Sequence, residues 1–272
     1  MRIAVTAPSR PLAPETAERV SALAQARWGE AVELVFHPQC FLEDGHFAGP
    51  DRARAEAFIE AANDPNFDAL WFARGGYGSG RMVEAAMAGL GSAAADKTYL
   101  GYSDGGVLLS ALHRAGVGRS VHGSMVDDVR RAGGEAAVMR SLAWLVEQDP
   151  TVLEPSLASD PRPAMAFNLA ILSGLMGTPW SPHLAGRVLM LEEVAEPTYR
   201  TDRMLWQLLS NPGVRRAAGV RMGRFTQVVP NDPEFGRGEE AILREWCERS
   251  GVPWLGYADI AHDPDNKVVP FG

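Results

Sequence analysis

A serine stands in the pattern Gly101-x-Ser103-x-Gly105, which has the spacing of a nucleophile elbow. In such an elbow the serine projects from a sharp turn between a strand and a helix, and the flanking glycines leave room for that turn. The N–H groups at the start of the following helix point back at the same spot, where they would stabilise an oxyanion. Three fixed positions in five residues also recur by chance, so an ordinary strand-to-helix turn is the alternative.

A serine nucleophile needs a general base, and the base needs a group that orients it. Of the six histidines, His262 stands just past an apolar strand and beside a polar loop, where a general base could act. Glu192 directly follows four apolar strand residues, so its carboxylate is expected to be partly buried and suited to orienting a histidine. The residue types therefore predict a triad of Ser103, Glu192 and His262. Alternatively, Glu192 merely ends a strand and His262 merely lies in a loop.

A glycine-rich loop at residues 74–81 reads Arg-Gly-Gly-Tyr-Gly-Ser-Gly-Arg. It matches neither the dinucleotide-binding fingerprint nor a P-loop with its terminal Lys-Ser or Lys-Thr pair, so a phosphate cradle is poorly supported. Its glycines would instead let backbone N–H groups approach a reacting carbonyl. For Arg74, at the start of the loop, a structural ion pair is the simpler interpretation.

The elements that must position these groups alternate between strand and helix in the first half of the chain. Strands are expected at residues 2–7, 31–37, 67–73 and 119–122, helices at 14–28, 51–63, 82–90 and 135–147, and a strand–turn–helix unit at 97–112. This alternation predicts an α/β fold with a parallel sheet covered on both faces, and such sheets bind ligands at the carboxyl ends of their strands. The glycine-rich loop, Ser103 and His122 all stand at such ends.

The composition changes after the first half, with prolines at 150, 155, 161 and 163. We therefore expect a nucleophile-elbow domain at residues 1–149, a linker at 150–165, and a C-terminal domain at 166–272 that carries Glu192 and His262. In this last part, helices are expected at 167–176, 199–209 and 239–249, and strands at 186–194, 218–227 and 253–260.

Composition and charge limit the kind of protein. The 272 residues suit two modest domains, and the net charge of −8 argues against nucleic acid and anionic membranes as partners. No apolar run approaches the roughly 20 residues of a membrane-spanning helix, and the first residues turn polar too soon for a signal peptide. Cys40 and Cys247 are too few and too far apart for a disulfide framework or a metal site. The expectation is a soluble, cytoplasmic protein.

Nine short segments, common individually, together form a specific set that runs through almost the whole chain. They are residues 5–9, 74–79, 101–104, 122–125, 168–169, 177–179, 187–193, 199–203 and 261–262. In this order they resemble the LD-carboxypeptidases, a serine peptidase family that includes murein tetrapeptide carboxypeptidases and microcin C immunity-type peptidases. The resemblance implies an N-terminal α/β sandwich with a mostly parallel sheet and a smaller, β-rich, barrel-like C-terminal domain, with the site between them.

The resemblance also implies a role for each site residue. His262, oriented by Glu192, would take the proton from Ser103 as the serine attacks the amide before a terminal D-amino acid. The oxyanion would be bound by the backbone N–H groups of Asp104 and Gly76, and water would then hydrolyse the acyl-enzyme. The implied substrate is a recycled murein tetrapeptide that loses D-alanine, and the reaction requires no metal or organic cofactor.

Two other functions stay open at this point. One is a microcin C immunity-type peptidase acting on peptide-like antibiotics, and the other is a catalytically inactive module that binds murein peptides in the same cleft. The partner would in each case be a peptide or a related small molecule, and homodimer formation is left open. Because only residues 264–272 follow the histidine loop, and chain ends tend to fray, we expect His262 to dock loosely over Ser103.

Overall fold

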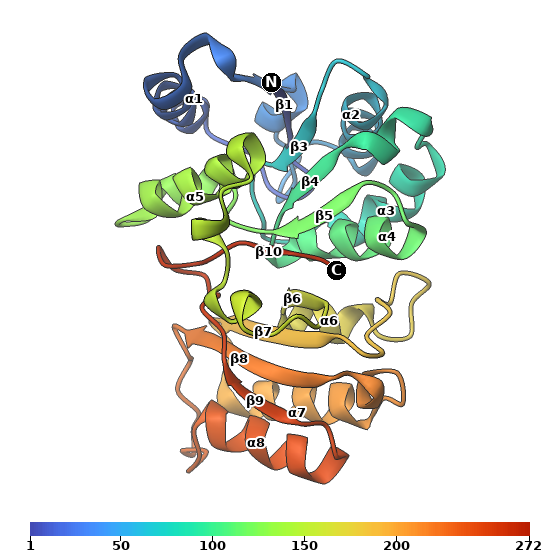
Figure 1. Cartoon of the computed structure of the whole chain (residues 1–272), viewed down its shortest axis with the longest axis vertical. Helices are drawn as coiled ribbons and strands as arrows, with labels where there is room; N and C mark the ends of the chain where they lie inside the picture. The colour runs from blue at the N-terminus through green and yellow to red at the C-terminus, as the bar shows by residue number, and fades with distance from the viewer.

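The computed structural model describes residues 1–272, which form two sheets with helices packed on each (Figure 1). The first sheet contains, in spatial order, β10 (Val269–Pro270), β5 (Arg119–His122), β4 (Thr98–Gly101), β3 (Ala69–Phe72), β1 (Arg2–Thr6) and β2 (Glu33–Phe36). All its neighbouring strands are parallel except β10, which runs antiparallel to β5. The α/β class and the mostly parallel first sheet are thus confirmed.

Five helices cover the two faces of this sheet. They are α1 (Pro14–Trp28), α2 (Asp51–Asn63), α3 (Ser79–Ala88), α4 (Gly106–Ala115) and α5 (Gly134–Glu147). Because successive strand residues point to opposite faces, Leu70 and Phe72 of β3 pack with α2, α3 and α4, whereas Trp71 packs with α1 and α5. All four residues of β3 are buried, which explains why this strand reads as one continuous apolar run.

The second sheet consists of four parallel strands: β6 (Ala164–Asn168), β7 (Val188–Val194), β8 (Gly219–Thr226) and β9 (Trp254–Tyr257). Three helices accompany it: α6 (Leu169–Leu175), α7 (Thr198–Ser210) and α8 (Glu239–Ser250), and α8 lies at the end of the molecule farthest from the first sheet (Figure 1). This half is therefore an open parallel sheet with helices, and the barrel-like form implied by the resemblance is not what the structure contains.

The strand β6 is where the sequence and the structure differ most. Its residues fall in the expected linker and the expected helix at 167–176, yet all five are buried and pair with β7. The helix begins only after Asn168, whose side chain caps it by accepting a hydrogen bond from the Ile171 N–H at 3.1 Å. A short apolar run gives no period by which a buried strand differs from a buried helix, so periodicity could not separate them.

The last residues of the chain connect the two sheets. After β9 the chain runs back past the second sheet and ends as β10 in the first sheet (Figure 1). Val269 pairs with His122 of β5, and the N–H of Gly272 donates to the Ala164 carbonyl of β6 at 3.2 Å. This segment is thus hydrogen-bonded on both sides, contrary to the expectation of a frayed end. No helix of the structure has both the length and the apolar character needed to cross a membrane.

Candidate active site

Ser103 lies in the sharp turn between β4 and α4, as the elbow pattern predicts. Its φ angle is 54°, a left-handed value that costs a non-glycine residue about 1–3 kcal/mol. The flanking glycines have ordinary dihedrals and are needed for space. A Cβ on Gly101 or Gly105 would lie 2.4 or 2.8 Å from the ring of Phe72. The serine therefore bears the backbone strain, and the glycines let the turn close against β3.

A cavity of about 310 Å³ opens beside this turn, and both Ser103 and His262 line it. The glycine-rich loop forms another wall, with Gly75 and Gly76 in the lining. A Cβ added to Gly75 would lie 3.2 Å from the Ser103 hydroxyl oxygen, so the loop backbone lies directly against the serine side chain. Gly76, which the family resemblance implies as an oxyanion donor, has a φ of 117° that favours glycine.

His262 and Glu192 meet in a buried hydrogen bond although they stand 70 residues apart in the chain. The His262 Nδ1 donates to Glu192 Oε2 at 2.7 Å, which leaves Nε2 as the free ring nitrogen. Glu192 is fully buried, and its Oε1 has no hydrogen-bond partner. Burial lowers the pKa of His262, but the charge and the hydrogen bond of Glu192 outweigh burial, so the pKa of His262 is raised above its ordinary value.

The strand β7 presents two consecutive buried carboxylates because its pairing with β8 is irregular between Leu191 and Glu193. Such a bulge re-aims side chains that would otherwise alternate between the two faces. Glu193 accepts hydrogen bonds from the N–H of Val194 at 2.8 Å and from the Asn168 side-chain amide at 2.7 Å. Burial raises the pKa of Glu193 to about 7. Glu193 is thus part of the scaffold around α6, whereas Glu192 holds the histidine.

The carboxylate of Asp104 fixes the elbow from the other side. Its Oδ2 accepts hydrogen bonds from the Ser79 N–H at 2.8 Å, from the Ser79 hydroxyl at 2.7 Å and from the Ser9 hydroxyl at 2.5 Å. The elbow is thereby joined to the loop after β1 and to the first turn of α3. The sequence pattern predicts only a backbone role for Asp104; polar turns at Ser9 and Ser79, each after an apolar strand, are the signal for its side-chain contacts.

Asn266 supports the histidine loop, and the sequence analysis did not single it out. Its Oδ1 accepts the Ala261 N–H at 3.1 Å and lies 3.1 Å from His122 Nε2 at the end of β5. Its side-chain amide donates to the Ser124 hydroxyl at 3.3 Å. Burial lowers the pKa of His122 to about 4, so this ring is neutral near pH 7 and serves as a hydrogen-bond donor to Asn266. One buried amide therefore ties the residue before His262 to the first sheet.

The elbow also contributes a ring that packs against the histidine. The ring centroids of Tyr102 and His262 lie 4.7 Å apart. The Tyr102 hydroxyl donates to Asp128 at 2.9 Å and accepts from the Arg131 guanidinium at 2.9 Å.

Two expectations for the cavity can be compared with the structure. Arg74 pairs with Asp127 at 3.1 Å, so the structural ion pair expected for Arg74 is present. No hydrogen bond joins Ser103 to His262 in the structure; the two share the cavity.

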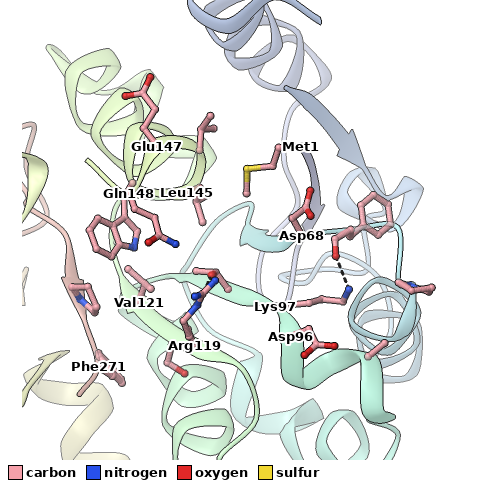
Figure 2. Close-up of a pocket in the computed structure, with 18 residues that line it drawn as sticks. Met1, Asp68, Asp96, Lys97, Arg119, Val121, Leu145, Glu147, Gln148 and Phe271 are labelled. Atoms are coloured by element: carbon pink, nitrogen blue, oxygen red, sulfur yellow. Dashed lines mark hydrogen bonds between the residues drawn. The ribbon is translucent and has the colours of Figure 1, made fainter. Parts of the chain in front are cut away.

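A larger cavity, about 780 Å³ in volume, lies at the opposite edge of the first sheet. It opens at the amino ends of β3, β4 and β5, among Asp68, Lys97 and Arg119, and the Lys97 ammonium there donates to the Phe67 carbonyl at 2.6 Å (Figure 2). No histidine or cysteine lines it. We place the candidate active site at the smaller cavity, because parallel sheets bind ligands at their carboxyl edges and the candidate nucleophile and base meet there.

No group of three or more His, Cys, Asp or Glu side chains is arranged to hold a metal ion. Cys40 and Cys247 are both buried and free, and burial raises the pKa of each thiol, to about 12 for Cys40 and about 11 for Cys247. Neither is therefore a reactive thiolate near neutral pH. The polar groups around the cavity suit acyl transfer with a serine hydroxyl, an imidazole and backbone N–H donors.

Two family models match the chain. The LD-carboxypeptidase N-terminal domain matches residues 3–123, and the LD-carboxypeptidase C-terminal domain matches residues 164–272. The chain belongs to the LD-carboxypeptidase family. It is accordingly a peptidase, and the two matched segments contain all the residues of the candidate triad.

Individual relatives agree with this placement. A murein tetrapeptide carboxypeptidase of Pseudomonas aeruginosa is 30% identical over the whole chain, which covers 91% of that protein. A solved muramoyltetrapeptide carboxypeptidase from Oxalobacter formigenes superposes with a TM-score of 0.77 at 23% identity, covering 99% of this chain and 93% of the other. The structure of MccF in complex with glutamyl sulfamoyl guanosine gives a TM-score of 0.78 at 17% identity, covering 100% and 91%. At these identities, the two solved structures show a similarity of fold.

Proposed function

We propose that this protein is a serine LD-carboxypeptidase that removes the terminal D-alanine from murein tetrapeptide during cell-wall recycling in the cytoplasm. The observation that carries the proposal is the buried 2.7 Å hydrogen bond from His262 to Glu192, at a cavity that Ser103 also lines. Family membership and the name of the Pseudomonas relative support the choice of substrate. The chemistry that follows assigns one role to each residue.

In the proposed first step, His262 Nε2 takes the proton of the Ser103 hydroxyl as its oxygen attacks the carbonyl carbon before the terminal D-alanine. The imidazolium that forms is stabilised by the Glu192 carboxylate, which accepts the Nδ1 hydrogen bond throughout. His262 then gives its proton to the departing nitrogen, and the carbon–nitrogen bond breaks. An acyl group remains on Ser103, and D-alanine leaves with a neutral amine.

In the second step the same groups act on water. His262 Nε2 takes a proton from a water molecule, whose oxygen attacks the ester carbonyl of the acyl-enzyme, and the proton returns to the Ser103 oxygen as the tripeptide leaves. In both steps the developing oxyanion would be bound by the backbone N–H groups of Asp104 and Gly76. Such fixed donors need no rearrangement as the charge forms, and removing one typically costs about 100- to 1,000-fold in rate.

The decisive experiment incubates the purified protein with murein tetrapeptide and follows released D-alanine and the shortened peptide by mass spectrometry. The Ser103→Ala variant is the matched control for contaminating peptidases. Release of D-alanine by the native protein but not by the Ser103→Ala variant supports the proposal. Glutamyl sulfamoyl guanosine is offered in parallel, because MccF has been solved in complex with this compound. Cleavage of this compound and not of the tetrapeptide would favour the immunity-type function, and tetrapeptide binding without cleavage would favour a binding module.

A further inference from the structure

The cavity at Ser103 contains more cationic side chains than its own carboxylates neutralise. Three arginines line it, together with two aspartates. Arg74 pairs with Asp127, and Arg131 pairs with Asp128, each at 3.1 Å. Arg10 has no carboxylate oxygen within 4.0 Å, so it is the one guanidinium in the cavity without an ion-pair partner.

The stem of Arg10 lies directly over the glycine-rich loop. A Cβ added to Gly76 would lie 2.4 Å from Arg10 Cδ and 2.7 Å from Cγ. The neighbouring Gly75 is the residue whose backbone lies against the Ser103 hydroxyl. The stem of Arg10 therefore lies over Gly76, one residue away from the loop position that contacts the candidate nucleophile.

The backbone on both sides of Arg10 is fixed, although the Arg10 side chain is exposed. The Ser9 hydroxyl donates to Asp104 in the elbow at 2.5 Å, and the Pro11 carbonyl accepts a hydrogen bond from Arg74 at 3.3 Å. Burial lowers the pKa of Arg74, and the nearby charge of Arg10 contributes to this. Two guanidiniums that repel each other, of which only Arg74 has a carboxylate partner, would be stabilised by an anionic ligand group.

The chemistry of a peptide end matches this arrangement. In a substrate whose last amide carbonyl reaches Ser103, the terminal carboxylate lies only about one residue length further, roughly 3.8 Å. An arginine fork binds such a carboxylate with two parallel hydrogen bonds. We propose that Arg10 binds the C-terminal carboxylate of the peptide and thereby restricts this peptidase to chain ends. This inference rests on the proposed function and adds the residue that recognises the end of the substrate.

The first test measures binding without turnover, in the Ser103→Ala background. Two probes differ in one group: murein tetrapeptide with a free terminal D-alanine carboxylate, and the same peptide ending in D-alaninamide. By calorimetry, the background protein is expected to bind the acid about 10- to 100-fold more tightly than the amide, the range of a charge-assisted hydrogen-bonded pair. Adding Arg10→Gln should abolish this preference, and Arg10→Lys should retain part of it.

A matched control is Arg52→Gln, which removes an exposed arginine on α2 that pairs with Glu56 outside the cavity. This variant should keep the full preference for the acid. The Arg10 inference is overturned if Arg10→Gln still prefers the acid, or if neither probe binds the background protein. Failure of the proposed function has a different signature, because the native protein would then release no D-alanine whatever the binding result. Melting curves of all variants verify that they are folded.

Discussion

The two sides of the candidate site are built in different ways. On the nucleophile side, Ser103 lies within a single strand–turn–helix unit, and the adjacent Asp104 anchors that unit to Ser9 and Ser79. On the base side, Glu192 comes from the second sheet, His262 from the segment after β9, and Asn266 from the chain that returns to the first sheet. The nucleophile depends on local backbone geometry, whereas the base depends on contacts between distant segments.

The difference extends to the physical character of the two sides. The elbow stores backbone strain at one residue, and its glycines matter because a larger residue would collide with Phe72. On the base side, the Glu192 carboxylate is fully buried and hydrogen-bonded to His262. Substitutions on the nucleophile side should therefore act on chemistry at every pH. Those on the base side should also change how activity depends on pH.

The largest effect is expected from Ser103→Ala, which removes the attacking oxygen. Turnover of murein tetrapeptide should fall by several orders of magnitude, up to about 10⁶-fold, the scale of nucleophile deletions in serine peptidases. The loss should be large at every pH from 6 to 9, because no change of pH can replace the missing nucleophile. Initial rates of D-alanine release measure the effect, and circular dichroism melting should show an unchanged fold. Near-native turnover would exclude Ser103 as the nucleophile.

Glu192→Gln keeps the shape of the side chain and removes its charge, so kcat should fall by about 10²- to 10⁴-fold. The pH profile separates this variant from a damaged fold. His262 must be neutral to accept a proton, and its pKa is raised by Glu192, so native kcat/KM should fall as the pH drops through a value above 6.5. Without the carboxylate, that acidic limb should move to lower pH.

Glu193→Gln is the matched control, since the neighbouring carboxylate is buried yet does not contact the histidine. It should leave the acidic limb in place, whatever it costs in stability. An identical shift in both variants would contradict the specific pairing of Glu192 with His262.

The raised pKa of His262 also makes folding stability depend on pH, in the direction opposite to that of activity. Since the pKa of His262 is raised in the folded state, the pair contributes stability that is complete below the unfolded value and is lost as pH rises through the folded value.

A smaller loss is expected from Asn266→Ala, which removes the amide that ties the Ala261 N–H and His122 together. His262 keeps its bond to Glu192 but loses one support of its loop, so kcat should fall about 10-fold with little change in KM. Asn66→Ala, on an exposed turn where the side chain bonds only to Asp64, is the control and should have no effect. A change in KM alone would argue against a positioning role for Asn266.

The same contrast explains how much of the site could be predicted from the sequence. The elbow is a local pattern, so the residues around Ser103 suffice to predict it as a nucleophile, and the apolar strand before Glu192 predicts a buried carboxylate. The contacts of Asn266 with His122 and Ser124 join positions more than 140 residues apart in the chain. No spacing along the chain encodes such pairs. Arg10 was missed because an isolated arginine in a loop carries no signal of its own.

For the fold, too, elements with a local sequence pattern could be predicted, and those that depend on distant contacts could not. Alternating strands and helices gave the first sheet, where each element has a clear period. The strand β6 was assigned to a linker and a helix because its five residues are buried on both faces and show no alternation. The returning strand β10 is only two residues long and includes a proline, so nothing in its composition predicts a sheet position. Its pairing with β5 depends on the tertiary structure.

The smallest effect is expected from removal of metal ions. Prolonged incubation with EDTA should leave kcat and KM unchanged, because no cluster of three or more ligand side chains exists and the proposed mechanism uses only side chains and backbone N–H groups. A structural metal on the base side would lower activity through loss of positioning and move the acidic limb, whereas a catalytic metal would remove activity at every pH. Loss of activity that zinc restores would contradict the serine mechanism and identify a metallopeptidase.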